Sequence, residues 1–361
     1  MPALKENILP PSVQEEDQPS NNLLQPPQPE ENLQRTRKPS ISQQQNNRRV
    51  SIRPSVIPKP VNLDSKEKAE DFLNRFDYIL TDCDGVLYVN NDAVPGVPQT
   101  LNKLRKMGKK VIFATNNSTK PREDFMKKLK ALGYEAEMDE LYSTNVAVAV
   151  YLESIGFKKK VFVVGMNGIS KELAKIGIDS FGVGPDPTPN GWTVGQCDID
   201  VEEGVGAVVI GFDNQISFPK LAKACSYVKQ EGCLFIASNS DETYPSPNKN
   251  IVVPGPGAYV AAIEAVTGKE PIALGKPYTF FFDCITTKHP YIDPKRTVMI
   301  GDRLTTDMVF GRNNGLSTLF VQTGLGTLEE MNNYRNSRNP ATARCVPDFY
   351  LNSLADLDKY L

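Results

Sequence analysis

The feature that most constrains the fold is an alternation of short apolar strands with amphipathic helices, which runs from about residue 78 onward. Residues 78–80 and 110–115 are β-prone runs typical of strands that are buried on both faces. Between them, Val97, Leu101 and Leu104 recur at the spacing of one helical face. Strands that alternate with helices of this length predict a parallel sheet with right-handed crossovers.

This alternation restarts in the middle of the chain, which predicts that a second α/β unit is inserted into the first. Strand-like runs at 161–164, 205–210 and 234–237 belong to the insertion, and strand 297–300 belongs to the resumed first unit. The predicted fold class is α/β, with a Rossmann-like parallel-sheet core and an inserted α/β domain. The predicted boundaries are 66–157 and 271–361 for the core, 158–270 for the insertion and 1–65 for an N-terminal tail.

The tail is a low-complexity segment rich in Pro, Gln, Asn and Ser. Because it has few apolar residues to offset the entropy of ordering, we predict that it is disordered. Arg48 and Arg49 precede Ser51, a pattern that suits a basophilic kinase acting on an unfolded chain. Phosphorylated Ser51 would carry about −2 charge and could anchor a phosphoserine-binding partner. The alternative is that so short a basic motif arises by chance.

Composition excludes several classes of protein. The 361 residues are enough for a substantial core, and a net charge of −2 favours neither a nucleic-acid nor a membrane partner. Six cysteines without a C-x-x-C pair are typical of reduced thiols, so we expect a cytoplasmic protein. The single histidine, His289, argues against a His-based triad and against zinc sites that need two imidazoles.

Polar side chains follow the predicted core strands at the points where those strands end. They are Asp82-Cys83-Asp84-Gly85, Thr115-Asn116-Asn117, Gly275-Lys276-Pro277 and the run Gly301 to Asp307. Because the carboxyl ends of parallel strands meet at one edge of a sheet, we expect these groups to converge. The alternative for the first of them is an acidic surface turn.

Several carboxylates at one edge would repel one another unless a cation lay among them. Oxygen donors without a His or Cys cluster favour a hard cation, and we expect Mg²⁺. A threonine hydroxyl, backbone N–H groups and a lysine ammonium suit the oxygens of a phosphoryl group. The sequence therefore predicts a phosphoryl-transfer site with a carboxylate nucleophile.

The stretches D-C-D-G-V, T-N-N, G-K-P and G-D-R-L-T-T-D resemble the four motifs of the haloacid dehalogenase-like phosphatases. Within that superfamily, F-A-T-N-N-S-T-K-P-R and R-T-V-M-I-G-D-R-L-T-T-D-M are similar to the group of phosphoglycolate, pyridoxal phosphate and 4-nitrophenyl phosphatases. The resemblance covers roughly residues 70–361. It implies that the insertion is a C2-type cap domain that covers the site and selects the substrate.

The resemblance also implies catalytic roles for the acids. Asp82 would be the nucleophile that becomes an aspartyl phosphate, and Asp84 would protonate the leaving oxygen and later activate water. Asp82, the Asp84 carbonyl and Asp302 would bind Mg²⁺.

Further roles implied by the resemblance concern phosphate binding. Thr115 would bind a phosphoryl oxygen beside the Asn116 amide, and Lys276 would offset charge on Asp82 and the phosphate. Asn117 would either join this site or only cap the local turn. Asp307 would orient Lys276 or a metal-bound water, and its alternative role is that of an acid favoured in the first turn of a helix.

Substrate and partners are less constrained. The predicted substrate loop, Glu242 to Lys249, has no histidine where the pyridoxal phosphate branch has one, which favours a small phosphoglycolate-like phosphoester. Tyr88 stands where relatives often carry Trp. Alternatives are a pyridoxal phosphate phosphatase, a phosphotransferase on the same core, or a non-catalytic phosphate-binding scaffold. Because relatives pair through their caps, we expect a homodimer.

Overall fold

The structure is a computed structural model that describes residues 58–188, 193, 199–245, 248, 250–337 and 339–361. The predicted disorder of the tail up to residue 57, the Ser51 phosphorylation site and Lys249 of the predicted substrate loop lie outside the described residues.

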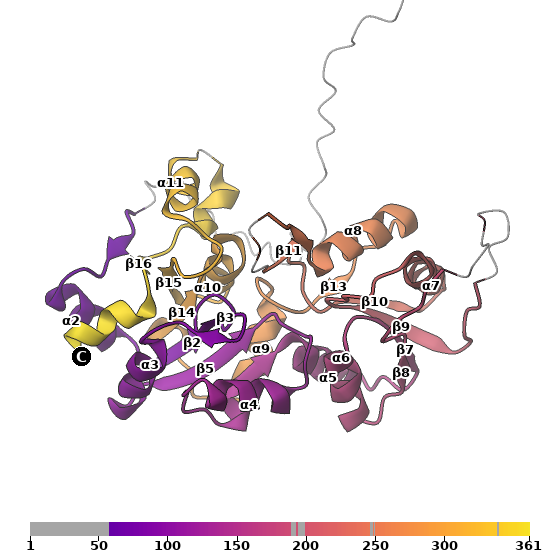
Figure 1. Cartoon of the computed structure of the whole chain (residues 1–361), viewed down its shortest axis with the longest axis horizontal. Coiled ribbons are helices and arrows are strands. Elements are labelled where there is room, and N and C mark those ends of the chain that lie inside the picture. The colour runs from indigo at the N-terminus through magenta and orange to yellow at the C-terminus, as the bar shows by residue number, and fades with distance from the viewer. Residues whose placement is uncertain (1–57, 189–192, 194–198, 246–247, 249, 338) are drawn as a thin grey trace, which may run out of the picture. The chain divides into compact units, whose positions relative to one another are not determined.

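The larger of the two parallel sheets formed by the described residues has seven strands, and every neighbouring pair runs parallel (Figure 1). Their spatial order is β1 (Val61–Asn62), β16 (Phe349–Leu351), β15 (Ser317–Val321), β14 (Thr297–Gly301), β2 (Tyr78–Thr81), β5 (Lys110–Thr115) and β6 (Leu141–Ser143). From β2 the chain builds outward on one side through β5 and later returns to the other side with β14. The strand order therefore reverses at β2, the place where open α/β sheets bind ligands.

The smaller sheet has five strands and is also parallel throughout. Its order is β13 (Ile272–Ala273), β10 (Leu234–Ala237), β9 (Val205–Ile210), β7 (Lys160–Val164) and β8 (Ser180–Phe181). Two short antiparallel ribbons complete the described strands: β3 (Tyr88–Val89) with β4 (Asp92–Ala93), and β11 (Thr243–Tyr244) with β12 (Val253–Pro254). The α/β class with parallel sheets is as predicted.

Helices connect the strands in the expected alternation. The described α-helices are α2 (Lys66–Arg75), α3 (Val97–Lys106), α4 (Arg122–Ala131), α5 (Thr144–Ser154), α6 (Asn167–Lys175), α7 (Phe218–Lys229), α8 (Pro256–Thr267), α9 (Thr279–Lys288), α10 (Val309–Asn313) and α11 (Leu328–Asn336). No helix of the described residues is both long enough and apolar enough to cross a membrane.

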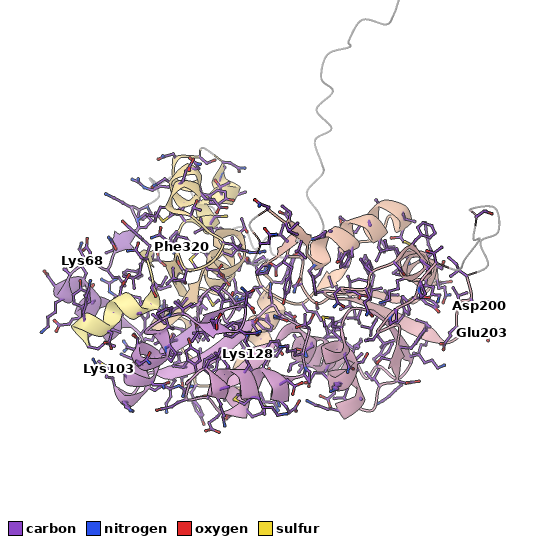
Figure 2. All side chains as sticks on the ribbon, viewed as in Figure 1. Lys68, Lys103, Lys128, Asp200, Glu203 and Phe320 are labelled. Atoms are coloured by element: carbon purple, nitrogen blue, oxygen red, sulfur yellow. The ribbon has the colours of Figure 1, made fainter. Side chains whose placement is uncertain are left out.

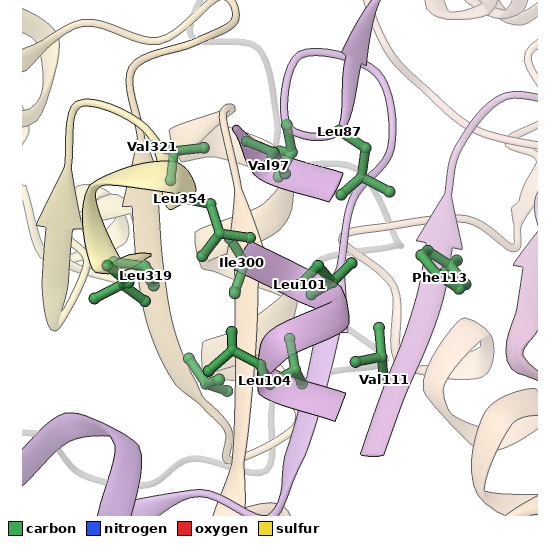
Figure 3. Packing of buried hydrophobic residues seen from close by; sticks show 14 of the residues in the cluster. Leu87, Val97, Leu101, Leu104, Val111, Phe113, Ile300, Leu319, Val321 and Leu354 are labelled. Carbon is green, nitrogen blue, oxygen red and sulfur yellow. The ribbon is translucent and has the colours of Figure 1, made fainter. Parts of the chain in front are cut away.

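The predicted helical stripe of α3 packs on the larger sheet. Leu101 and Leu104 are fully buried, and they belong to one hydrophobic cluster with Val111 of β5 and Ile300 of β14 (Figure 3). A second cluster covers the other side of the larger sheet and continues, through α5 and α6, to β7 and β9 of the smaller sheet. The strands are apolar at nearly every position because both of their faces are buried.

Some predicted boundaries are corrected by the structure. The tail was expected to extend to residue 65, but Val61 and Asn62 form the edge strand β1, paired with Phe349 and Tyr350, and Leu63 is buried. Residues 272–273, predicted to return to the core, pair with β10 in the smaller sheet. The chain closes with the 3₁₀ helix Leu354–Tyr360. Strand pairing over two residues depends on neighbours elsewhere in the chain, so it leaves no periodic signal.

Candidate active site

The end of β2 carries the two acids of the first motif. Thr81 pairs with Phe113 on one side and Ile300 on the other, and the Asp82 N–H donates to the Ile300 carbonyl at 2.8 Å. The chain then turns at Gly85, whose φ of 84° is costly for other residues. A Cβ at Gly85 would lie 2.5 Å from Oδ2 of Asp302. The glycine therefore lets the loop approach the acid that follows β14.

Lys276 joins the first and last motifs. Its side chain is 1% exposed, and its ammonium lies 2.9 Å from Oδ1 of Asp82 and 2.7 Å from Oδ1 of Asp307. Two ion pairs raise the pKa of Lys276, although burial opposes them. The lysine is therefore a fixed cation at the strand ends. Asp307 also accepts a hydrogen bond from the Arg303 N–H, so it does more than favour a helix start.

Asp82, Asp302 and Asp307 form a compact acidic group in which one carboxylate oxygen from each lies within 4.8 Å of the others. Burial raises the pKa of Asp302 to about 7, and the charge of Asp307 adds to this effect. Burial also raises the pKa of Asp82 well above its ordinary value, although Lys276 opposes the shift. One lysine thus compensates three buried acids only in part, and the group could hold a cation.

Asp84 lies beside this group and has a separate set of partners. The Asn117 amide donates to its Oδ2 at 3.3 Å, and the Tyr88 hydroxyl lies 3.5 Å from the same oxygen. Burial raises the pKa of the Asp84 carboxyl, while the nearby Lys128 ammonium and the Asn117 hydrogen bond oppose the shift. The two acids of the first motif therefore occupy different environments.

The last residue of β5 and the two residues that follow it line a pocket at the end of the sheet, but they have different partners. Thr115 is buried, and its hydroxyl accepts a hydrogen bond from the Asn117 N–H. The Asn116 side chain donates to the Lys276 carbonyl and accepts from the Lys276 N–H, so it fastens the second motif to the third. Asn117 does more than cap a turn, because its carbonyl accepts from Thr119 while its amide reaches Asp84.

Sequence reasoning missed two polar residues that the smaller domain, the one built on the smaller sheet, contributes. Asp241 accepts from Arg303 at 3.1 Å and from Asn116 at 3.0 Å, and Asn239 donates to the Asn116 carbonyl. Both residues follow strand β10. Their position just beyond the end of a predicted parallel strand is the sequence signal by which they could have been identified.

Two aromatic rings from the smaller domain line the same pocket. Phe212 and Tyr244 stack with their ring centroids 4.1 Å apart, and the Tyr244 hydroxyl accepts from the Asn117 amide. Tyr244 belongs to the predicted substrate loop, and this part of the loop does lie at the pocket. Phe212 follows β9 and was not predicted.

Cys83 lies between the two acids and is 1% exposed. Burial raises the pKa of its thiol well above the ordinary value, and the charges of Asp82 and Asp84 act in the same direction. A buried thiol held in its protonated form is a poor nucleophile, so Cys83 is suited to filling space.

Comparison with known proteins agrees with this arrangement. Residues 79–179 match a family model described as haloacid dehalogenase-like hydrolase, and residues 273–357 match one described as HAD-hydrolase-like. Human glycerol-3-phosphate phosphatase is 38% identical over 305 residues, which cover 81% of this chain and 93% of the relative. Phosphoglycolate phosphatase 1A, chloroplastic, from Arabidopsis thaliana is 34% identical over 313 residues, covering 84% and 82%. The solved p-nitrophenyl phosphatase from Archaeoglobus fulgidus superposes with a TM-score of 0.66 at 27% identity, covering 79% and 99%. The chain therefore belongs to the haloacid dehalogenase-like hydrolase family.

Proposed function

We infer that this protein is a phosphatase that hydrolyses phosphate monoesters of small molecules through an aspartyl phosphate on Asp82. The observation that carries this inference is the buried Lys276 ammonium, held between Asp82 and Asp307 at the switch point of the larger sheet. It fixes a positive charge beside the carboxylate oxygen that would attack phosphorus. The relatives named above are phosphatases, which supports the same reaction.

The side chains around Asp82 suit the remaining roles. Thr115 and the loop after β5 would bind phosphoryl oxygens, and Lys276 would offset their charge. Asp84 would give a proton to the leaving oxygen and then take one from the water that hydrolyses the acyl phosphate. Its raised pKa, which follows from burial, favours a carboxyl that holds a proton when substrate binds.

The acidic group fits a Mg²⁺ ion. Its ligands are oxygens only, and a single lysine, Lys276, forms ion pairs with two of the three carboxylates, those of Asp82 and Asp307. Asp82, Asp302 and the Asp84 carbonyl would hold the ion, with Asp307 supporting Lys276. When bound, Mg²⁺ would neutralise charge on the carboxylates and on the phosphoryl group.

Two substrate classes are candidates. The missing histidine of the substrate loop favours a phosphoglycolate-like ester. The described lining residues favour a neutral alcohol instead, because their only cations, Lys276 and Arg303, are both ion-paired. The Asn239 amide and the Tyr244 hydroxyl would form hydrogen bonds with the hydroxyls of a glycerol phosphate.

The test is phosphate release from glycerol phosphate, phosphoglycolate, pyridoxal phosphate and 4-nitrophenyl phosphate, each with Mg²⁺ and with EDTA. We expect turnover with Mg²⁺ only.

The substitution Asp82→Asn should lower kcat by more than about 10³-fold, because an amide cannot form an acyl phosphate. Substantial activity in Asp82→Asn would refute the nucleophile, and no release from any ester would favour the non-catalytic scaffold. Adding a free alcohol and looking for its phosphate ester distinguishes a phosphotransferase.

A further inference from the structure

Tyr88 is a buried side chain whose position the proposed reaction does not yet explain. It is 1% exposed and lies in ribbon strand β3, four residues after Asp84. The turn between them is closed by backbone hydrogen bonds from Gly85 N–H to the Tyr88 carbonyl and from Tyr88 N–H to the Cys83 carbonyl. The phenol is thereby folded back, and its hydroxyl lies 3.5 Å from Oδ2 of Asp84.

The ring of Tyr88 is held from its face by Lys128 of α4, a residue labelled in Figure 2. The Lys128 ammonium lies 3.3 Å from the ring centroid and donates to the Asn90 carbonyl at 2.6 Å. A cation over an aromatic face is attractive, so this contact fixes the plane of the ring. The same ammonium is fastened to the loop that joins β3 to β4.

The two oxygens of the Asp84 carboxyl differ in their hydrogen-bond partners. Among the described residues, donors reach Oδ2 only, one from Asn117 and one from Tyr88. A phenol is protonated at neutral pH, so Tyr88 can act as a donor to this oxygen. With Oδ2 occupied by two donors, the proton of a neutral carboxyl belongs on Oδ1.

We propose that Tyr88 is a positioning residue that holds Oδ2 of Asp84 so that Oδ1 carries the proton toward the leaving group. The proposal rests on the proposed function. As the bond from phosphorus to the ester oxygen breaks and the bond to Asp82 forms, the Oδ1 proton passes to that oxygen. The alcohol leaves neutral, and Asp84 is left as a carboxylate. Tyr88 gives up no proton and touches neither phosphorus nor the ester oxygen.

The leaving group distinguishes this role from simple packing. An alkyl phosphate needs its leaving oxygen protonated, whereas 4-nitrophenolate departs without a proton. Tyr88→Phe removes the hydroxyl and keeps the ring over which Lys128 lies. We expect kcat/KM for the best alkyl phosphate of the panel to fall about five- to tenfold, the worth of one hydrogen bond, while that for 4-nitrophenyl phosphate changes less than about twofold.

Tyr134→Phe is the matched control. Tyr134 is also buried, and its hydroxyl donates to the Leu87 carbonyl in the same loop without contacting Asp84. We expect loss of the Tyr134 hydroxyl to lower the free energy of unfolding. Any change in kcat/KM should be the same for alkyl phosphates and for 4-nitrophenyl phosphate. Lys128→Met provides a second test that leaves the tyrosine intact, and the same selective loss on alkyl phosphates is expected.

Equal losses on both esters in Tyr88→Phe, or no loss on either, would overturn the proposal, as would a selective loss in Tyr134→Phe. A wild-type protein that hydrolyses aryl phosphates alone would also overturn it, because no proton would then be needed. Wild-type protein that hydrolyses neither ester would instead refute the proposed function, so the two failures are distinguishable.

Discussion

Burial and repulsion both oppose ionisation of Asp302, because the residue is 4% exposed and its carboxyl lies beside Asp307. The folded chain holds its proton up to a pKa of about 7, whereas the ordinary value is 3.8. Between these pH values the folded state binds more protons than the unfolded state. The contribution of Asp302 to the free energy of unfolding is therefore largest below about pH 4 and is lost as the pH rises toward 7.

We predict that, in EDTA, Asp302→Asn is more stable than the wild type by up to ~4 kcal/mol at pH 8 but by less than about 2 kcal/mol at pH 5, because an amide does not ionise. Mg²⁺ should stabilise the wild type at pH 8 and the variant much less. Urea unfolding at the two pH values measures both effects. A difference between the proteins that does not vary with pH would contradict this account.

At the same scale, the sequence revealed the acids that follow core strands, because a carboxylate after a buried strand stands out in a single run of residues. It did not reveal Asp241, which follows a strand of the smaller sheet and meets the core residues Asn116 and Arg303 only in the folded chain. Nor did the sequence predict the contact between Lys128 and Tyr88. This contact depends on how helix α4 packs against the β3–β4 ribbon, which lies 40 residues earlier in the chain. Side chains that meet through tertiary packing carry no local signal.

Helix α7 contains the most deeply buried ion pair of the smaller domain's described residues. Lys220 is fully buried and lies 2.6 Å from Asp213, which follows the pocket residue Phe212. One turn further along, Lys223 pairs with Asp186 at 2.8 Å, but these side chains are 22% and 30% exposed. The two lysines have the same chemistry and differ in their access to water.

We predict that Lys220→Met lowers the free energy of unfolding by about 3–5 kcal/mol, because it leaves the Asp213 carboxylate buried without its partner. Lys223→Met, the matched control, should cost less than about 1 kcal/mol, since water replaces an exposed partner. Denaturant unfolding of both variants makes the comparison. Similar costs would show that burial of the pair contributes little.

Among elements, the long strands and the amphipathic helices were predictable because each buries a repeating set of apolar residues. After β14, a π-helical turn, Leu304–Met308, continues directly as α10, and no apolar repeat distinguishes the two. Strands β1, β8 and β13 have two residues each, too few for any period. Their place depends on hydrogen bonds to strands that are distant in sequence.

For the whole molecule, we propose a homodimer that forms through the smaller domain. Its edge strand β8 pairs with β7 on one side only, among the described strands, and such an edge is a template for association. Sedimentation at micromolar concentration in reducing buffer should give twice the chain mass. A monomer under those conditions would contradict the proposal.

Because α5 and α6 lie in a hydrophobic cluster that contains strands of both sheets, the two domains do not have separate interiors. Ala147 of α5 and Val163 of β7 are buried in that single cluster. The smaller domain therefore cannot be exchanged between relatives, in evolution or in the laboratory, by joining the chains at the connecting segments alone. A chimera keeps its packing only if α5 is inherited together with the strands that it covers, so the two domains are expected to change sequence in concert.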